Sequence, residues 1–227
     1  MNSPQPQTTA ERALEFITDG AVVGLGTGHA ATAFIHALAA RVRDGMRVRG
    51  VPTSLSSAEL AAELEIPLTT LDEIEAIDVD VDGADEVDPQ GNLIKGYGGA
   101  LVREKIVAAA SRHLVILVGP EKLVPRLGSH GKLPVEVIPF AVAPCSRALT
   151  ALGCLPEPRL HDGRIFVTDN GNVILDCRVQ PLSRADQLET ALRAIPGVVG
   201  TGLFVGMNPT VLIQRGAAVE VRGHGSA

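Results

Sequence analysis

The apolar positions of the first half of the chain form short blocks that alternate with helical patterns. Short runs of consecutive or alternating apolar residues predict buried strands, and apolar residues spaced three or four apart predict helices. Strands alternating with helices imply a parallel sheet that is covered on both faces. The predicted strands are 21–26, 47–52, 67–71, 76–82 and 113–119, and the predicted helices are 11–17, 29–45, 56–65 and 100–111.

From about Gly131 the order of elements changes. The pattern predicts a strand, a helix, two strands joined across Asn170-Gly171, a helix and a strand, which is the order of a ferredoxin-like unit. Two short strands within 210–221 end the chain. We therefore expect an α/β protein with a Rossmann-like parallel-sheet domain and a smaller ferredoxin-like α+β domain. The predicted domains are 1–130 plus about 203–227, and 131–202.

The composition of the 227 residues argues against two classes of binding partner. Hydrophobic residues make up 45% of the chain and the net charge is −6, without a block of Lys and Arg. Nucleic acid and membrane are therefore not expected as partners. No apolar run approaches the roughly 20 residues of a membrane-spanning helix, and residues 1–10 are polar, so we expect a short mobile tail on a soluble protein. Three cysteines without metal-ligand spacing favour a reduced, cytoplasmic protein.

A glycine-rich loop, Gly24-Leu25-Gly26-Thr27-Gly28, joins the first strand to a helix. Exposed N–H groups and the helix dipole favour an anion such as phosphate at this position, although the glycines are also compatible with a simple tight turn. A nicotinamide or flavin cofactor is disfavoured, because His29 replaces the third glycine of the dinucleotide pattern. In addition, no acidic residue follows the second strand to bind a ribose hydroxyl.

The segment 78–88 contains six carboxylates. Its start resembles a calcium loop, but Pro89 stands where the last ligand should be, and the alternation with Ile and Val predicts a strand instead. Asp82 lies at the carboxyl end of that strand, where parallel sheets bind ligands, and Asp85 follows in the turn. Asp78 and Asp80 are expected to be structural or solvated. Glu86 and Asp88 are expected to be solvated turn residues.

Position alone does not select the remaining charged candidates. Lys95 lies among glycines, where a cation can stabilise an oxyanion, but a solvated loop lysine is the commoner case. Glu104 falls in a first helical turn, where the helix dipole alone favours an acidic residue. Lys122 follows the strand 113–119 at the carboxyl side of the sheet.

At these residues the sequence resembles the A-type ribose-5-phosphate isomerases. The resemblance rests on "GLGTG", "VPTS", "DGADEVDP", "GGALVREKIVA", "PVEVIP", "TDNGNVILD" and "AIPGVVGTGLF", which span nearly the whole chain. It implies the two domains predicted above, a homo-oligomer (dimer or tetramer), no metal and no cofactor. It also implies the interconversion of ribose 5-phosphate and ribulose 5-phosphate.

The resemblance further implies a role for each candidate residue. Glu104 is the general base, Asp82 and Asp85 assist ring opening and bind sugar hydroxyls, Lys95 is the catalytic loop lysine, and Lys122 binds substrate. The implied phosphate loop is Thr27, Gly28, His29 and Ala30, and the implied substrate-binding backbone adds Gly83, Ala84, Gly96, Tyr97 and Gly98. A carboxylate whose pKa is raised from about 4.3 by partial burial suits the transfer of a proton from C2 to C1 of an aldose.

Three positions depart from the family pattern. His29 and Ala30 replace a Ser-Thr pair, which removes two hydroxyl donors from the phosphate loop, and Tyr97 replaces a glycine beside Lys95. A different aldose or aldose phosphate therefore remains an alternative substrate. A non-catalytic sugar-phosphate sensor and a coenzyme A transferase or sugar-phosphate deaminase of related fold are further alternatives. The sensor is disfavoured because no helix-turn-helix segment precedes the first strand. The transferase and the deaminase are disfavoured because they should show an acidic motif different from "DGADEVDP" with "REK".

Overall fold

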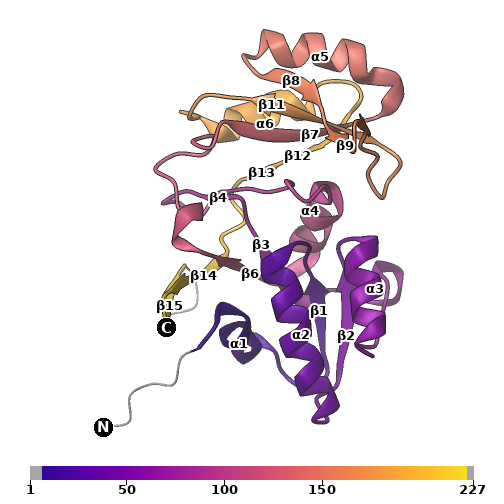
Figure 1. The fold of residues 1–227 in the computed structure, drawn as a ribbon, viewed down its shortest axis with the longest axis vertical. Helices are drawn as coiled ribbons and strands as arrows, with labels where there is room; N and C mark the ends of the chain where they lie inside the picture. Colours follow the sequence, from indigo (N-terminus) through magenta and orange to yellow (C-terminus); the bar gives the residue numbers. More distant parts are fainter. Residues whose placement is uncertain (1–6, 224–227) are drawn as a thin grey trace. The chain divides into compact units, whose positions relative to one another are not determined.

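The computed structural model describes residues 7–223, which form two compact units. The first unit contains the chain up to Gly83, Arg103–Lys122 and the chain from Met207 onward, and the second contains Ala84–Val102 and Leu123–Gly206. Most helices and strands of both units are labelled in Figure 1. Residues 1–6 of the tail expected at 1–10 lie outside the described residues, whereas Thr9 already begins a helix.

The first unit is built on a six-stranded sheet with the order β15-β14-β6-β3-β1-β2. All neighbours in it are parallel except β14 and β15. Every residue of β1 is buried, as expected for a strand covered on both faces. The strands are β1 (Ala21–Leu25), β2 (Val48–Pro52), β3 (Ile77–Gly83), β6 (Ser111–Val118), β14 (Thr210–Arg215) and β15 (Ala218–Arg222).

Helices cover both faces of this sheet, because successive strand residues point to opposite sides. Val23 and Val79 pack with Phe34 of α2, whereas Val22 and Val51 pack with Val107 of α4. The helices are α1 (Thr9–Ala13), α2 (His29–Arg43), α3 (Leu55–Glu63) and α4 (Leu101–Ala110), with the 3-10 turns Leu14–Phe16, Leu71–Glu73 and Pro120–Lys122. The expected strand at 67–71 is reduced to a single bridge between Gly50 and Leu68.

The second unit contains an antiparallel sheet with the order β12-β7-β11-β8. Helices α5 and α6 pack on one of its faces through a shared apolar core that includes Leu149 and Leu192. This order confirms the ferredoxin-like prediction. The elements are β7 (Lys132–Val137), the 3-10 turn Pro139–Ala141, α5 (Val142–Ala151), β8 (Leu155–Pro158), β11 (Val173–Arg178), α6 (Ala185–Arg193) and β12 (Val198–Thr201).

The two units differ from the predicted domains in three segments. Residues 84–102, 123–130 and 203–206 belong to the second unit, not to the first. The reason is a three-stranded sheet, β13-β5-β4, in which a segment after β3 pairs with a segment after β12. Gly202 separates β12 from β13, so the one strand expected at the end of the ferredoxin-like unit is two strands in the structure. The remaining strands are β4 (Glu86–Val87), β5 (Leu93–Ile94), β9 (Leu160–His161), β10 (Arg164–Ile165) and β13 (Leu203–Phe204).

Candidate active site

The glycine loop of the first unit lies directly against the carboxylates of β3. A Cβ atom on Gly24 would overlap the carboxyl group of Asp80 and lie 2.7 Å from Val107, and one on Gly26 would overlap Asp82. Gly28 differs, because it has a φ of 98° and caps the N-terminus of α2. Two glycines therefore allow close approach of backbone to carboxylates, and the third provides a left-handed conformation.

Asp82 is held rigidly at the carboxyl end of β3. The side chain is fully buried, and its Oδ1 accepts hydrogen bonds from the N–H of Thr27 at 3.1 Å and of Gly83 at 2.7 Å. The glycine loop thus orients this carboxylate through one of its own backbone donors. The sequence prediction that Asp82 lies at the end of the strand is confirmed by the structure.

Hydroxyl groups gather around Thr27. Its Oγ1 lies 2.7 Å from the hydroxyl oxygen of Thr53 and donates to Ser54 at 2.9 Å, and Ser57 donates to the carbonyl of Gly26 at 2.6 Å. Sequence reasoning did not select Thr53, Ser54 or Ser57. The signal was present in "VPTSLSS", which follows β2, the strand that pairs with β1. His29, by contrast, is an exposed residue at the start of α2, and Ala30, the next residue, is partly buried.

Glu104 lies in the first turn of α4 and is only 3% exposed. The helix dipole explains an acidic residue in a first turn, but it does not require that the residue be buried. Carboxylates are rarely buried so completely without a specific reason. Lys122, the last residue of the 3-10 turn after β6, is partly buried.

In the second unit, Asp85 and Lys95 lie on neighbouring backbone segments. The N–H of Asp85 donates to Ile94 at 2.8 Å, and Oδ2 of Asp85 accepts from the N–H of Tyr97 at 2.9 Å. Lys95 is 3% exposed, and its Nζ lies 5.6 Å from the centroid of the Phe204 ring. Lys95 is therefore a buried lysine, not the solvated loop lysine that sequence alone made the commoner case.

Backbone conformation in the Lys95 loop depends on glycine. Gly96 has a φ of 101° and Gly99 has a φ of 94°, and a Cβ atom on Gly99 would lie 2.6 Å from the ring of Phe166. Ala84 is partly buried and Gly98 is exposed. The loop is thus shaped by positions at which a larger residue would be strained.

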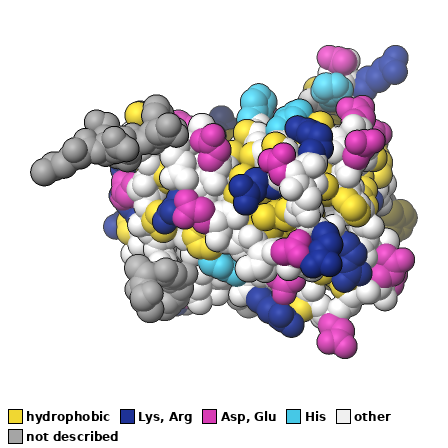
Figure 2. All heavy atoms as spheres, turned by 90° about the horizontal axis from the view of Figure 1, so that it is seen from below, with side chains coloured by type: hydrophobic (Ala, Val, Ile, Leu, Met, Phe, Trp, Pro, Cys, Tyr) yellow, Lys and Arg dark blue, Asp and Glu magenta, His cyan; other side chains and the backbone are white. Residues whose placement is uncertain are grey.

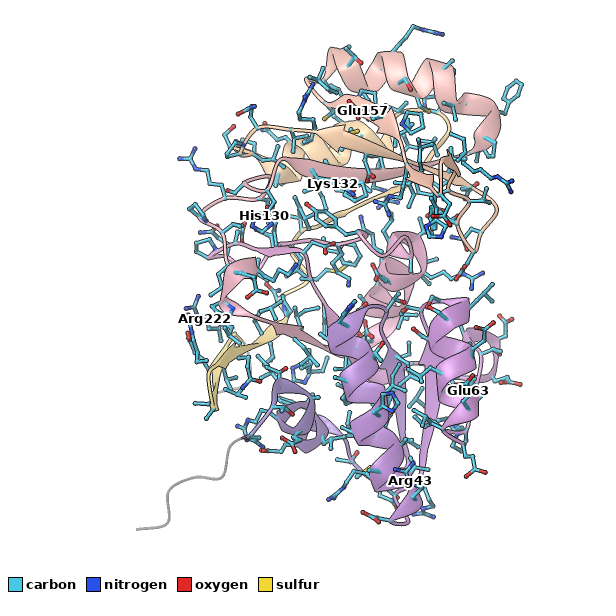
Figure 3. All side chains as sticks on the ribbon, viewed as in Figure 1. Arg43, Glu63, His130, Lys132, Glu157 and Arg222 are labelled. Carbon is cyan, nitrogen blue, oxygen red and sulfur yellow. The ribbon has the colours of Figure 1, made fainter. Side chains whose placement is uncertain are left out.

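The Tyr97 side chain packs against the core of the second unit. Its hydroxyl donates to the carbonyl of Lys132 at 3.2 Å, and the ammonium of Lys132 lies 4.7 Å from the ring centroid. Burial, and then the negative charges of Asp85, Glu86 and Asp176, raise the pKa of the Tyr97 hydroxyl far above its usual range. Tyr97 therefore remains a protonated donor. Lys132 is labelled on β7 in Figure 3.

The other carboxylates of the acidic segment have structural roles, with one correction. Glu86 is fully buried, not solvated, because it accepts hydrogen bonds from the N–H groups of Gly128 at 2.6 Å and His130 at 2.7 Å. Asp88 accepts from the backbone of its own turn, as expected. Asp78 accepts from the N–H of Val22 at 2.9 Å, and Asp80 is fully buried within the sheet.

Residues 7–223 contain neither a cluster of metal ligands nor a membrane-spanning helix. No group of three or more His, Cys, Asp or Glu side chains within that range is arranged to hold a metal ion. None of the helices in the described part of the chain is long and apolar enough to cross a membrane. On the face shown in Figure 2, the basic and acidic side chains are interspersed.

The fold is that of an α/β protein in which a glycine-rich loop leads into helix α2, the first unit buries Asp82 and Glu104, and the second unit buries Lys95. Comparison with known proteins identifies the family. Residues 49–217 match the family of ribose 5-phosphate isomerase A, also described as phosphoriboisomerase A. The chain belongs to this family.

Curated relatives and solved structures match over nearly full length. The ribose-5-phosphate isomerase A of Gloeobacter violaceus is 52% identical over 95% of this chain and 94% of its own. That of Roseiflexus castenholzii is 51% identical over 90% and 88%. The structure of ribose 5-phosphate isomerase A from Methanocaldococcus jannaschii is 40% identical, with a TM-score of 0.91 over 95% and 96%. A D-ribose-5-phosphate isomerase in complex with phospho-erythronic acid is 38% identical, with the same TM-score and coverage.

Proposed function

We propose that this protein is an aldose-ketose isomerase that interconverts D-ribose 5-phosphate and D-ribulose 5-phosphate, a reaction of the non-oxidative pentose phosphate pathway. Membership of the family supports the activity. The assignment of catalytic roles to particular residues rests on one observation: Glu104 and Lys95, which carry opposite charges, are each only 3% exposed. Burial of charged groups is costly, and it is typical of functional positions.

In the proposed reaction, the Glu104 carboxylate removes the proton from C2 and returns it to C1 through an enediolate. The ammonium group of Lys95 stabilises the negative charge that develops on the oxygen, which is often the largest single contribution to catalysis. Asp82 and Asp85 assist ring opening and bind sugar hydroxyls. Their fixed hydrogen bonds to Thr27, Gly83 and Tyr97 support this role, since oriented groups need no reorganisation during the reaction.

The substrate phosphate is proposed to bind the loop Thr27–Ala30, with Lys122 as a further substrate-binding cation. The N-terminus of the fifteen-residue helix α2 supports an anion at this loop. The hydroxyls of Thr53, Ser54 and Ser57 support it further, because they surround Thr27 although His29 and Ala30 carry none. Gly83, Ala84, Gly96, Tyr97 and Gly98 remain proposed substrate-binding positions.

Two variants test this function. Glu104→Gln removes the base while keeping the size of the side chain, so ketose formation from ribose 5-phosphate should fall by about 10²- to 10⁴-fold. Glu63→Gln is the matched control, because Glu63 is exposed on α3 and should keep wild-type turnover (Figure 3). Near-normal turnover of Glu104→Gln would remove Glu104 from the mechanism. No ketose from the wild type at high protein concentration would support a sensor instead.

Comparison of ribose 5-phosphate with free ribose and neighbouring aldoses tests the substrate. We expect the highest kcat/KM for ribose 5-phosphate, because the loop Thr27–Ala30 offers donors that only a phosphorylated sugar would use. Equal rates with free ribose would contradict a phosphate site at this loop.

We also propose a homo-oligomer in the cytoplasm. Exposed apolar side chains of the second unit support self-association, since Phe140 is 96% exposed and Leu160, Ile165 and Val167 are at least half exposed. Three free cysteines support a reducing compartment. Light scattering of the wild type and of Phe140→Ser tests the oligomer; a wild-type monomer would contradict it.

A further inference from the structure

Arg159 follows β8 in the second unit and lies outside the residues to which a role in the reaction was assigned. Its guanidinium forms a two-point ion pair with Asp176 of β11: Nε donates to Oδ2 at 2.9 Å, and Nη2 donates to Oδ1 at 2.5 Å. The side chain is only 9% exposed. Because a guanidinium is planar, two such hydrogen bonds fix the direction of its remaining donors.

The remaining nitrogen of Arg159 points to the Lys95 loop. Nη1 donates to the carbonyl oxygen of Gly96 at 2.9 Å and to that of Tyr97 at 3.0 Å. These carbonyls belong to the two residues that directly follow Lys95. Arg159 therefore connects β11 to the loop that holds the proposed catalytic lysine.

One peptide group links Arg159 to Asp85. The carbonyl of Gly96 and the N–H of Tyr97 belong to the same planar peptide unit. Arg159 binds the oxygen of that unit at 2.9 Å, and Oδ2 of Asp85 accepts from its N–H, also at 2.9 Å. Rotation of this peptide would break both hydrogen bonds. A cation on the carbonyl also polarises the N–H and strengthens its bond to a carboxylate.

Two neighbouring side chains, Lys132 and Phe166, also contact this network of Arg159, Asp176 and Tyr97. Lys132 lies 3.1 Å from Oδ2 of Asp176 and covers the ring of Tyr97. The guanidinium of Arg159 lies 5.8 Å from the centroid of the Phe166 ring, and a Cβ atom on Gly99 of the same loop would lie 2.6 Å from that ring. The Arg159 side chain is 9% exposed and that of Asp176 is 19% exposed, so the charge-assisted hydrogen bonds between them lie largely out of water and are strong.

We propose that Arg159, oriented by Asp176, is a positioning residue of the isomerase. It fixes the Gly96–Tyr97 peptide so that this peptide orients the Asp85 carboxylate and holds the adjoining Lys95. The proposal deepens the proposed function and rests on it. It predicts that loss of Arg159 lowers kcat more than it raises KM, because the proposed role of Arg159 acts through the Lys95 loop and not on the substrate.

Steady-state kinetics test the proposal with Arg159→Ala, Arg159→Lys and a matched control. Arg184→Ala is the control, because Arg184 forms an exposed ion pair with Asp186 in the same unit. We expect kcat of Arg159→Ala to fall at least about 30-fold and guanidinium chloride at millimolar concentration to restore part of it. Arg159→Lys should retain an intermediate kcat, since a single ammonium group cannot make all the hydrogen bonds of the planar guanidinium. Arg184→Ala should match the wild type and gain nothing from guanidinium.

Hydrogen-deuterium exchange gives a readout that does not depend on activity. In Arg159→Ala the amides of 96–99 should exchange at least about tenfold faster, while those of β1 and β3 remain unchanged. Unchanged exchange at 96–99, wild-type kinetics, or a loss of kcat that guanidinium does not restore would each overturn the positioning role. A wild type without isomerase activity would instead overturn the proposed function, and exchange would then decide the positioning role by itself.

Discussion

Gly26 and Asp82 lie in such close contact that no side chain fits between them. A Cβ atom on Gly26 would overlap the Asp82 carboxyl group and lie 2.7 Å from the Asp82 Cα. Because one of these contacts is to backbone, a rotamer change of Asp82 cannot relieve the overlap. The glycine at this position thus serves the carboxylate and not a turn conformation.

Gly26→Ala should therefore displace Asp82 and lower both stability and turnover. Overpacking of this kind costs about 1–3 kcal/mol, so the midpoint of urea unfolding should fall clearly. Gly83→Ala is the control for stability, because its Cβ would lie 3.6 Å from Ala30, an ordinary van der Waals distance. Equal unfolding midpoints for Gly26→Ala and the wild type would show that β1 and β3 separate easily.

Glu136→Ala should destabilise the second unit by about 3 kcal/mol. Oε1 of Glu136 is fully buried and accepts hydrogen bonds from Thr168, Asn170 and Asn172, which together form the turn before β11. Removal of the carboxylate leaves the buried Thr168 hydroxyl without this acceptor. Glu157→Ala, at an exposed position of β8 (Figure 3), should change unfolding by less than about 0.5 kcal/mol. Similar urea midpoints for the two variants would contradict the structural role of Glu136.

His113 should make the protein more sensitive to acid. Burial lowers the pKa of His113 from its ordinary value of 6.5. Since the unfolded chain binds this proton more readily, the stabilisation is complete above about pH 6.5 and is lost as the pH falls through the lower pKa of the folded state.

Urea unfolding at pH 5 to 8 checks the effect of His113. The free energy of unfolding of His113→Gln should fall less steeply below pH 6.5 than that of the wild type. His36→Gln, at an exposed position of α2, should follow the wild type. Parallel curves for His113→Gln and the wild type would exclude His113 as a source of the acid sensitivity.

The three cysteines should be unreactive in the folded protein. Burial raises the pKa of the thiols of Cys145, Cys154 and Cys177, and the neighbouring Cys154 and Asp176 raise that of Cys177 further. Because the thiolate is the reactive form, an aromatic disulfide reagent at pH 8 should label none of them until urea is added. Glu157→Cys should react at once and serves as the positive control. Rapid labelling of the native wild type would show that the second unit opens readily.

The sequence by itself determined the alternating strands and helices, the ferredoxin-like order of elements and the family. These features follow from local periodicity and from motifs, which need no knowledge of distant contacts. Strand position also selected Asp82 and Asp85, because only residues at or just after the end of a strand lie at the carboxyl edge of the sheet. Lys95 and Glu104 were selected by resemblance alone.

Only the tertiary structure decided which charged residues are buried and which segments pair. Residues 84–102 belong to the second unit because β5 pairs with β13, more than 100 residues away in the chain. Glu86 is buried because residues 128–130 donate to it, and Arg159 reaches the carbonyl of Gly96 from 63 positions away. Burial and pairing of this kind depend on which elements pack together, and no local pattern of the sequence carries that information.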